Sequence, residues 1–286
     1  MKILFQQNTS AEILKTSAIN QTIFLEDVII GIFFAAFICF ISYKAKFLTL
    51  SGTIATFILA GLIFSLGGIQ WSVPILTFFF LSSILSKLRK KKNENVELYF
   101  DKSGVRDHMQ VIANGGLGGV LVVLNVLYSN EIFYLMYLAL LAAVCADTWA
   151  TEIGTWKKTN TYNILNLQKV EQGVSGGISF RGIVGSLAGS FIIMLSGLIW
   201  ITVPYVKYLL LIILSGLLGS LVDSILGATI QIQYKCCTCG KVTERKIHCG
   251  METKYYKGLS IINNDVVNLI AGISGILFLI ILRRTI

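Results

Sequence analysis

The sequence predicts an all-α membrane protein whose helices cross the bilayer several times. Hydrophobic residues make up 55% of the 286 residues and charged residues only 14%, a composition that is unusual for a soluble domain. The apolar residues gather in repeated runs of about 20, the length at which a helix spans the hydrocarbon core. Only two prolines occur, so these runs seldom contain the residue that most strongly interrupts a helix.

The apolar runs divide the chain into spans and connections. A single membrane domain is expected over residues 27–286, preceded by an extracytoplasmic segment at 1–26. Three connections are long, at 89–108, 150–181 and 230–261, and they alternate with short ones. The expected spans number about eight, over residues 27–43, 50–69, 72–88, 109–128, 131–149, 182–201, 206–229 and 262–282.

The basic residues predict the orientation of the chain. Most of the 24 lysines and arginines lie in or beside the long connections, so the positive-inside rule places these loops in the cytoplasm and both termini outside. The net charge of +9 then belongs mainly to one face, where it also attracts anionic lipid. Nucleic acid is not an expected partner, because the basic residues flank membrane spans. The sequence gives no signal for an oligomeric state.

Polar clusters occur at the predicted cytoplasmic ends of four spans. Residues three, four or seven apart share one face of a helix, so several of these clusters form polar stripes. Because the spans alternate in direction, all four clusters fall at the same membrane level. The members are Asp107, Gln110 and Asn114; Asp147, Thr151 and Glu152; Asp223; and Asn263, Asn264, Asp265 and Asn268.

Acids and amides at one level predict a Mg²⁺ site. Magnesium prefers oxygen ligands and is usually held by one or two carboxylates together with substrate phosphates. A carboxylate inside an apolar span costs about 2.5–3.5 kcal/mol to insert, which makes Asp223 a strong functional candidate. The alternatives are that Asp107 and Asp265 cap helices and that Asp147 is an interfacial acid. The expected ligands are Asp147, Glu152, Asp223 and Asp265.

A glycine-rich segment, EQGVSGGISFRG at 171–182, predicts a phosphate site where the sixth span begins. Glycines let backbone amides approach an anion, the helix N-terminus adds favourable partial charge, and an arginine supplies a bidentate fork. The alternatives are a simple turn and an arginine that only anchors the topology. The expected substrate contacts here are Ser175, Gly176, Gly177, Ser179 and Arg181, with Arg106 from the 89–108 connection.

The six cysteines divide into two groups. Cys39 and Cys145 lie in predicted spans and are expected to pack as small core residues. The other four lie in YKCCTCGKVTERKIHCG, where Cys236, Cys239, His248 and Cys249 offer three thiolates and an imidazole for a structural Zn²⁺. Cys237 could replace Cys236. Reduced structural thiols and redox chemistry are the alternatives, and a cytoplasmic loop disfavours disulfides.

Five motifs resemble those of a known family. SGVRDHMQVIANGG, ADTWATEIG, GVSGGISFRG, CTCGKVTERKIHCG and NNDVVN occur here in the order of the membrane family that contains the plant phytyl-phosphate kinase. Its bacterial and archaeal relatives were long of unknown function. The resemblance covers roughly residues 30–282. It implies transfer of the γ-phosphoryl group of a nucleoside triphosphate, with CTP favoured, to a prenyl monophosphate of the phytyl or geranylgeranyl type.

The chemistry of the acceptor supports that implication. A lipid phosphate is already anionic near neutral pH, so catalysis needs no strong base and rests on positioning and charge neutralisation. The expected catalytic residues are Asp107, Asp147, Glu152, Asp223 and Arg181. A cytidylyltransferase would use the same two substrates but release pyrophosphate. An ion-coupled transporter or flippase is the alternative from another class, since intramembrane acids also suit transport.

Overall fold

The computed structural model describes residues 25–102, 104–201 and 205–285, so the predicted segment 1–26 lies almost wholly outside the described residues. Within these residues, seven helices are long and apolar enough to cross a membrane, which confirms a multi-span helical membrane protein. They are the first helix Leu25–Lys44, α2 Leu50–Lys92, the segment His108–Tyr128, α5 Ile132–Gly154, the segment Phe180–Trp200, Val206–Thr229 within α7, and Asn264–Arg284 within α8.

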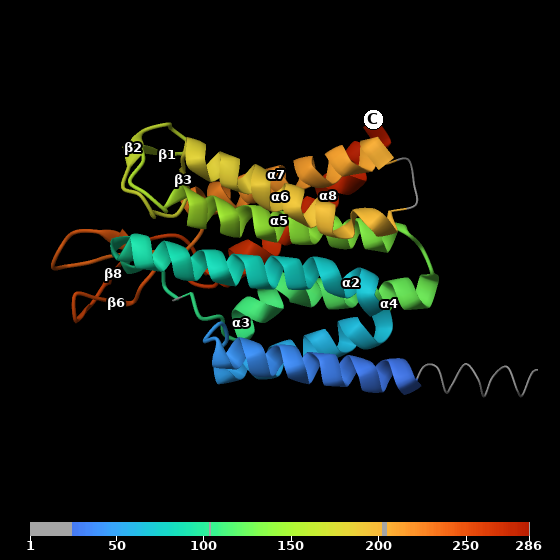
Figure 1. Ribbon diagram of the computed structural model, residues 1–286. Coiled ribbons are helices and arrows are strands. Elements are labelled where there is room, and N and C mark those ends of the chain that lie inside the picture. The colour runs from blue at the N-terminus through green and yellow to red at the C-terminus, as the bar shows by residue number, and fades with distance from the viewer. Residues whose placement is uncertain (1–24, 103, 202–204, 286) are drawn as a thin grey trace, which may run out of the picture.

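Helix α2 consists of two membrane-spanning segments that are joined by a sharp bend. Its 43 residues include Gly68, whose φ of 62° and ψ of −158° are not helical, and the chain turns back there (Figure 1). Glycine tolerates this conformation because it has no Cβ. Pro74 lies inside the second half without being the bend. The two halves match the spans predicted over 50–69 and 72–88.

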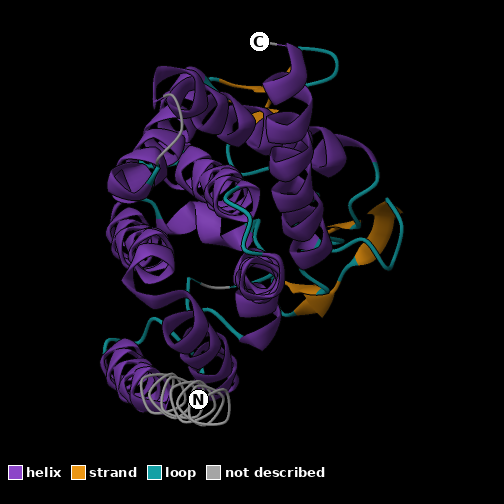
Figure 2. Ribbon diagram, turned by 90° about the vertical axis from the view of Figure 1, so that its right-hand side faces the viewer, coloured by secondary structure: helices purple, strands orange, loops and turns teal. Residues whose placement is uncertain are grey.

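Helix α5 forms the centre of the bundle and packs against α2, α6 (Phe180–Gly197), α7 (Tyr205–Thr229) and α8 (Asn264–Thr285). Small residues let the backbones approach closely, as is common between membrane helices. A Cβ on Gly189 of α6 would lie 2.7 Å from the carbonyl oxygen of Cys145 in α5. The polar residues of α5 and of the start of α6 are therefore held at a fixed spacing. The first helix lies at the edge of the bundle opposite the C-terminus (Figure 2).

The fourth predicted span contains a π-helical turn. It begins as α3 (His108–Val111), continues as the π-helix η2 (Ile112–Gly116) and ends as α4 (Leu117–Tyr128). π turns often mark functional positions because the extra residue redirects side chains. Here the turn contains Asn114, whose buried Oδ1 has no hydrogen-bond partner within the described residues.

Short strands occupy two of the predicted long loops, and the sequence did not predict them. One antiparallel sheet has the order β2-β1-β3, from Lys169–Val170, Thr161–Asn163 and Gly177–Ile178. A second has the order β5-β4-β8, from Val242–Thr243, Gln233–Lys235 and Lys254–Lys257. A third pairs β6 (Ile247–His248) with β7 (Met251–Glu252).

All three long connections meet at one end of the bundle, where Figure 1 shows the strands. The 3₁₀ helix η1 (Glu94–Leu98) belongs to the first connection, and Thr243 Oγ1 donates a hydrogen bond of 2.9 Å to the carbonyl oxygen of Leu98. The boundaries differ from the prediction, because α2 continues to Lys92 and α5 to Gly154. The common end is as expected. Which side of a membrane it faces remains a prediction.

Candidate active site

A polar cavity of about 230 Å³ opens at the strand-bearing end of the bundle. Its wall combines the ends of α2, α5 and α7, the starts of α6 and α8, the π turn, and the long loops. The cavity gathers most of the predicted site residues, which come from five separate segments of the chain. These are Arg106, Gln110, Asn114, Asp147, Thr151, Glu152, Ser175, Gly176, Gly177, Ser179, Asp223, Asn263, Asn264, Asp265 and Asn268.

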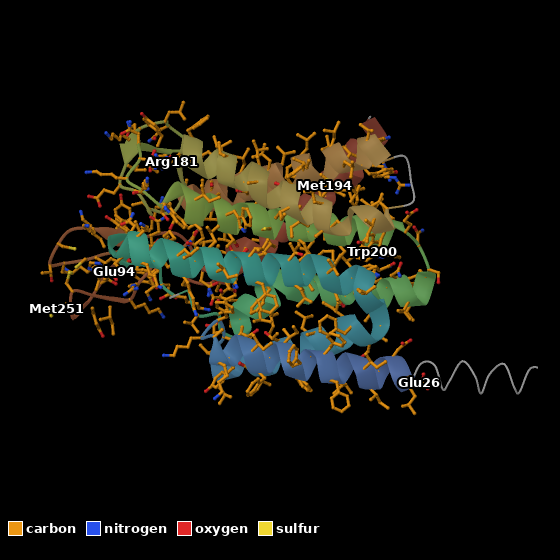
Figure 3. The ribbon with its side chains drawn as sticks, in the orientation of Figure 1. Glu26, Glu94, Arg181, Met194, Trp200 and Met251 are labelled. Atoms are coloured by element: carbon orange, nitrogen blue, oxygen red, sulfur yellow. The ribbon has the colours of Figure 1, made fainter. Side chains whose placement is uncertain are left out.

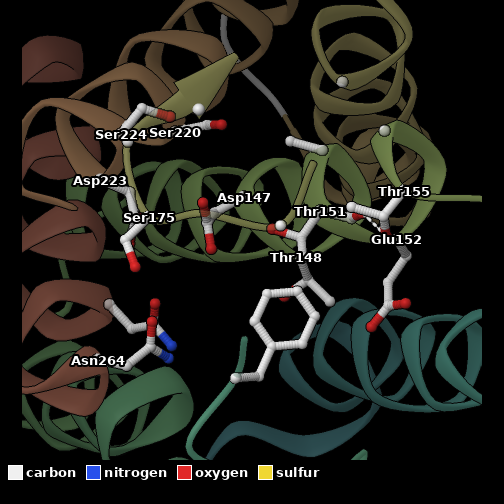
Figure 4. A pocket seen from close by; sticks show the side chains of 18 of the residues that line it. Asp147, Thr148, Thr151, Glu152, Thr155, Ser175, Ser220, Asp223, Ser224 and Asn264 are labelled. Carbon is white, nitrogen blue, oxygen red and sulfur yellow. Dashed lines mark hydrogen bonds between the residues drawn. The ribbon is translucent and has the colours of Figure 1, made fainter. Parts of the chain in front are cut away.

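Asp147 and Asp223 lie next to each other in this cavity. Asp147 is on α5 and Asp223 on α7, both line the cavity (Figure 4), and they are close enough to affect each other electrostatically. The buried Oδ2 atom of Asp223 has no hydrogen-bond partner within the described residues. Two adjacent carboxylates repel each other, and burying such charge without a counter-charge is costly. The pair therefore has the properties of a cation site.

A third acid, Glu244, joins this pair, and the sequence did not predict it. It comes from the loop between β5 and β6 and interacts electrostatically with both Asp147 and Asp223. Its Oε1 accepts hydrogen bonds of 2.7 Å from Ser175 Oγ and from Gln231 Nε2. Burial raises the pKa of Glu244, and these hydrogen bonds offset the rise only in part. No residue spacing in the loop indicated that Glu244 reaches the cavity.

None of these three acids forms an ion pair with a lysine or arginine among the residues that the structure describes. Amide side chains surround them instead, and Asn264 faces the same space as Asp147 in Figure 4. Carboxylate and amide oxygens around an uncompensated negative charge suit a hard divalent cation. The donor set therefore fits Mg²⁺.

Glu152, predicted as a metal ligand, has a different environment. Its Oε2 accepts a 2.6 Å charge-assisted hydrogen bond from Arg89 Nε, and its Oε1 accepts a 2.6 Å hydrogen bond from Ser86 Oγ. Arg89 also pairs with Glu97 at 2.6 Å. Figure 4 shows Glu152 away from Asp147, beside Thr155. We therefore reassign Glu152 from metal binding to a buried ion-pair network, which needs such satisfied partners to be tolerated.

Asp107 was predicted to be catalytic, but in the structure it caps a helix. Its carboxylate accepts a 3.0 Å hydrogen bond from the backbone N–H of Gln110, and the Gln110 side chain accepts one of 3.2 Å from the backbone N–H of Asp107. This reciprocal arrangement is a capping box. Asp107 does not line the cavity, so the alternative reading as a cap replaces the catalytic one.

Lys102 joins Asp107 to Asp265. Its Nζ lies 2.8 Å from Asp107 Oδ2 and also contacts Asp265 Oδ2. Burial tends to raise the pKa of Asp107, but the hydrogen bonds from Lys102 and Gln110 dominate and hold that pKa below its usual value. Asp265 lines the cavity and keeps a buried Oδ1 without a partner within the described residues. Lys102 thus pairs with one carboxylate oxygen of Asp265, and the other oxygen has no partner among the described residues.

Arg181 was predicted to clamp a phosphate, but its side chain is exposed and does not line the cavity. It lies near the start of α6 (Figure 3). Ser179 caps that helix by accepting a 3.1 Å hydrogen bond from the N–H of Gly182. Successive helical residues are rotated by about 100° around the axis, so the side chain two positions after the cap points away from it. Two other arginines, Arg89 and Arg106, line the cavity instead.

Arg106, unlike Arg89, forms no ion pair among the residues that the structure describes. It is 8% exposed, lines the cavity, and its guanidinium lies 5.5 Å from the ring of Phe78 and 5.4 Å from that of Phe79. Burial lowers the pKa of Arg106 to about 10, which still leaves the group charged at neutral pH. Its Nη1 also donates a hydrogen bond to Ser83 Oγ. Arg106 therefore brings a fixed positive charge to the cavity wall.

The glycine-rich loop lines the cavity as predicted, but packing explains part of its composition. Gly176 has a φ of +81°, and a Cβ there would lie 2.5 Å from the backbone nitrogen of Ala228. Ser175, expected to contact a phosphate, donates its hydroxyl to Glu244. The loop thus links α6 to the end of α7 beside the acids.

Outside the cavity, the structure brings Cys236, Cys239, His248 and Cys249 together, with their candidate ligand atoms all within 4.8 Å of one another. Cys237 is exposed and is not a member of this cluster, which answers the question of which neighbouring cysteine belongs to it.

The fold and the cavity together define an integral membrane protein with a buried acidic site at one end of a helical bundle. The chain belongs to the family described as integral membrane protein DUF92, whose model matches residues 33–276. This match confirms the family indicated by the sequence motifs.

Relatives occur in plants and archaea. Protein PGR of Arabidopsis thaliana is 32% identical over 268 residues, which cover 85% of this chain and 92% of that protein. The uncharacterized membrane protein MJ0933 of Methanocaldococcus jannaschii is 27% identical over 234 residues, covering 81% and 84%. Protein VTE6, chloroplastic, of Arabidopsis is 24% identical over 244 residues, covering 83% and 66%. No solved structure matches the chain.

Proposed function

We propose that the protein is a prenyl-monophosphate kinase that transfers the γ-phosphoryl group of a nucleoside triphosphate, CTP by preference, to a phytyl- or geranylgeranyl-type phosphate. The observation that carries the proposal is the cavity in which Asp147, Asp223 and Glu244 meet with no lysine or arginine of the described part of the chain paired to them. The motif resemblance to the family of the plant phytyl-phosphate kinase supplies the substrate class.

Asp147 and Asp223 would hold Mg²⁺, with Glu244 beside them, and their carboxylate oxygens support this proposal. The unpartnered, buried Oδ2 of Asp223 is an atom for which such an ion would supply the partner. When bound there, Mg²⁺ would neutralise charge on the nucleotide phosphates. Asp147 and Asp223 would hold it from two different helices, so their spacing is fixed by the packing of α5 against α7.

The other residues of the cavity would orient two phosphate-bearing substrates. Arg106 and Lys102 offer positive charge, and Gln110, Asn114 and Asn264 offer amide N–H groups. An acceptor phosphate is already a nucleophile near neutral pH, since its second pKa is about 6. The protein then needs to align donor and acceptor and to compensate charge, which is what most phosphoryl transfer requires. The prenyl chain would lie along the apolar helices.

A direct assay tests this proposal. The purified full-length protein in detergent micelles would be given Mg²⁺, CTP and geranylgeranyl or phytyl phosphate, and the products would be separated. Prenyl diphosphate and CDP, formed only when Mg²⁺ is present, are the expected products. Pyrophosphate and a CDP-lipid would instead identify a cytidylyltransferase, which the same cavity could serve.

The same preparation tests the transport alternative. Asp147 lies seven residues before the end of α5 and Asp223 six residues before the end of α7, nearer one end of the bundle, whereas transporter sites typically lie near the bilayer midplane. Uptake of prenyl phosphate into liposomes without nucleotide, together with no product in the assay above, would overturn the kinase proposal.

A further inference from the structure

The cysteine- and histidine-bearing loop has the geometry of a closed metal site. His248 Nδ1 lies 3.6 Å from Cys239 Sγ and 3.1 Å from Cys249 Sγ, and Cys236 Sγ lies 3.8 Å from the carbonyl oxygen of His248. Tetrahedral zinc has Zn–S bonds of about 2.3 Å, which places its ligand atoms roughly 3.8 Å apart. The candidate ligand atoms all lie within 4.8 Å of one another, so small side-chain adjustments suffice.

Two tight turns present these ligands in pairs. In the first, the backbone N–H of Gly240 donates a 3.0 Å hydrogen bond to the carbonyl oxygen of Cys236, and Gly240 has a φ of +71°. In the second, Cys249 has a φ of +53° and Gly250 a φ of +74° between β6 and β7. A cysteine in the left-handed region is strained relative to glycine, so this position calls for a reason other than turn formation.

A second observation independent of spacing also points to a ligand. Cys236 is 2% exposed and His248 is 5% exposed, yet all the cysteines in the described residues are free thiols. The buried His248 Nε2 has no partner within the described residues, while Nδ1 faces the sulfurs. Three thiols around one imidazole nitrogen make a Cys₃His set, which is a common structural zinc site.

The loop between the two turns carries Glu244 into the cavity. The backbone N–H of Glu244 donates a 2.9 Å hydrogen bond to the carbonyl oxygen of Tyr99, and Arg245 Nε donates one of 2.7 Å to that of Phe100. These contacts attach the middle of the loop to the 97–101 segment. The cysteine–histidine cluster brings the two turns on either side together.

We propose that Cys236, Cys239, His248 and Cys249 bind one Zn²⁺, and that this ion fastens the two turns so that Glu244 is held beside Asp147 and Asp223. The proposal that these residues bind zinc does not depend on the proposed function. The positioning of Glu244 for Mg²⁺ binding rests on the proposed function.

Metal content tests the first half without any reaction. The full-length protein, purified in detergent without chelators, should contain about one zinc per chain by elemental analysis. Cys239→Ser should lose it. Cys237→Ser is the matched control, because it removes a neighbouring exposed thiol outside the cluster, and it should keep the zinc.

Cobalt substitution keeps the test decisive if Cys239→Ser does not fold. Protein produced with Co²⁺ should show the thiolate-to-cobalt charge-transfer bands and the intense visible bands of tetrahedral coordination. Wild-type protein with neither zinc nor this spectrum would overturn the zinc site, as would equal metal loss in Cys237→Ser and Cys239→Ser.

Two measurements test the second half. Removing zinc with a chelator should speed amide hydrogen exchange over 243–245 in the wild-type protein. In the kinase assay, Cys239→Ser and Glu244→Gln should both raise the Mg²⁺ concentration needed for half-maximal rate, by about 10- to 100-fold, while Glu244→Gln keeps its zinc. Unchanged exchange, or an unchanged Mg²⁺ requirement in Cys239→Ser, would overturn the positioning role. If the protein has no kinase activity, the proposed function is wrong, and metal content and hydrogen exchange still decide whether the zinc site exists and holds the loop.

Discussion

Two groups of acidic residues lie at the same end of the helical bundle, and they differ in what balances their charge. Glu152 and Glu97 share Arg89, a guanidinium that is 2% exposed and bonds to both. Asp147, Asp223 and Glu244 have no such partner within the described residues. The first group is complete as folded. The second has uncompensated negative charge, and this difference separates a structural network from a site suited to a cation.

The largest expected effect follows from removing the unbalanced group. Asp147→Asn and Asp223→Asn should each lower kcat of the proposed kinase by at least about 100-fold, since each loses a charged oxygen ligand of the metal. Neither change should lower the melting temperature, because each relieves repulsion between adjacent carboxylates. Steady-state kinetics and thermal melts in detergent measure the two effects. Near-parental turnover in both variants would remove these residues from the metal site.

Changing the balanced group should give the reverse pattern. Arg89→Met leaves Glu152 without a cation and Glu97 with only Lys90, at 3.8 Å, and should destabilise the protein by about 3–5 kcal/mol. Neutralising those carboxylates at the same time, with Glu97→Gln and Glu152→Gln, should restore much of the melting temperature. If the triple variant were no more stable than Arg89→Met, the network would not be the source of the loss.

A smaller effect distinguishes the two arginines. Arg106→Ala should lower kcat/KM by about 10- to 100-fold, since it removes a charged hydrogen-bond donor from the cavity wall. Arg181→Ala is the matched control, because that side chain is exposed and outside the cavity. It should stay within about twofold of the parent. The opposite ranking, measured with varied prenyl phosphate, would return the phosphate contact to Arg181.

The smallest effect concerns Asp107, the cap that the sequence suggested was catalytic. Asn caps helices about as well as Asp, so Asp107→Asn should lose only the contact with Lys102, about 0.2–1 kcal/mol. Asp107→Ala should lose the cap as well, about 1 kcal/mol more. Both variants should keep near-parental activity, and a large loss of kcat in Asp107→Asn would restore the catalytic role.

The stabilising contribution of the Asp107–Lys102 contact depends on pH in a definite direction. The folded protein holds the pKa of Asp107 below its usual value, so its stabilising contribution is present above the ordinary aspartate pKa of about 4. It is lost as pH falls through the lower folded-state pKa. Thermal melts of the parent and Asp107→Asn should therefore converge on acidification. A gap that widens in acid would contradict the assigned ion pair.

The sequence predicted the spans well because each apolar run is long enough to decide its own structure. It did not predict the strands, which are only two to four residues long and depend on the contacts between loops. The buried ion pairs of Arg89 were not predicted, for a related reason. Arg89 lies in the basic run that ends α2, where it resembles a topology signal, and only Glu97 and Glu152, from elsewhere in the chain, make it a buried partner.

The candidate site was predictable where polar residues interrupt apolar helices, as at Asp147 and Asp223. It was not predictable where a loop delivers the side chain. Glu244 has no helical or strand periodicity around it, and its position follows from Ser175, Gln231 and the 97–101 segment. The prediction for Arg181 was wrong for the opposite reason. The residue lies at the start of α6, as predicted, but the rotation of that helix turns its side chain outward.

The bend at Gly68 has a consequence for how the protein meets its surroundings. α2 turns back on itself there, and residues 129–131 join α4 to α5 directly, so these two connections at the end opposite the strands are short. The exposed thiols of Cys237, Cys239 and Cys249 all lie in the strand-bearing loops, whereas Cys39 and Cys145 are buried. A membrane-impermeant maleimide therefore has targets on one side only, and the native chain reports its own orientation in intact cells or inverted vesicles.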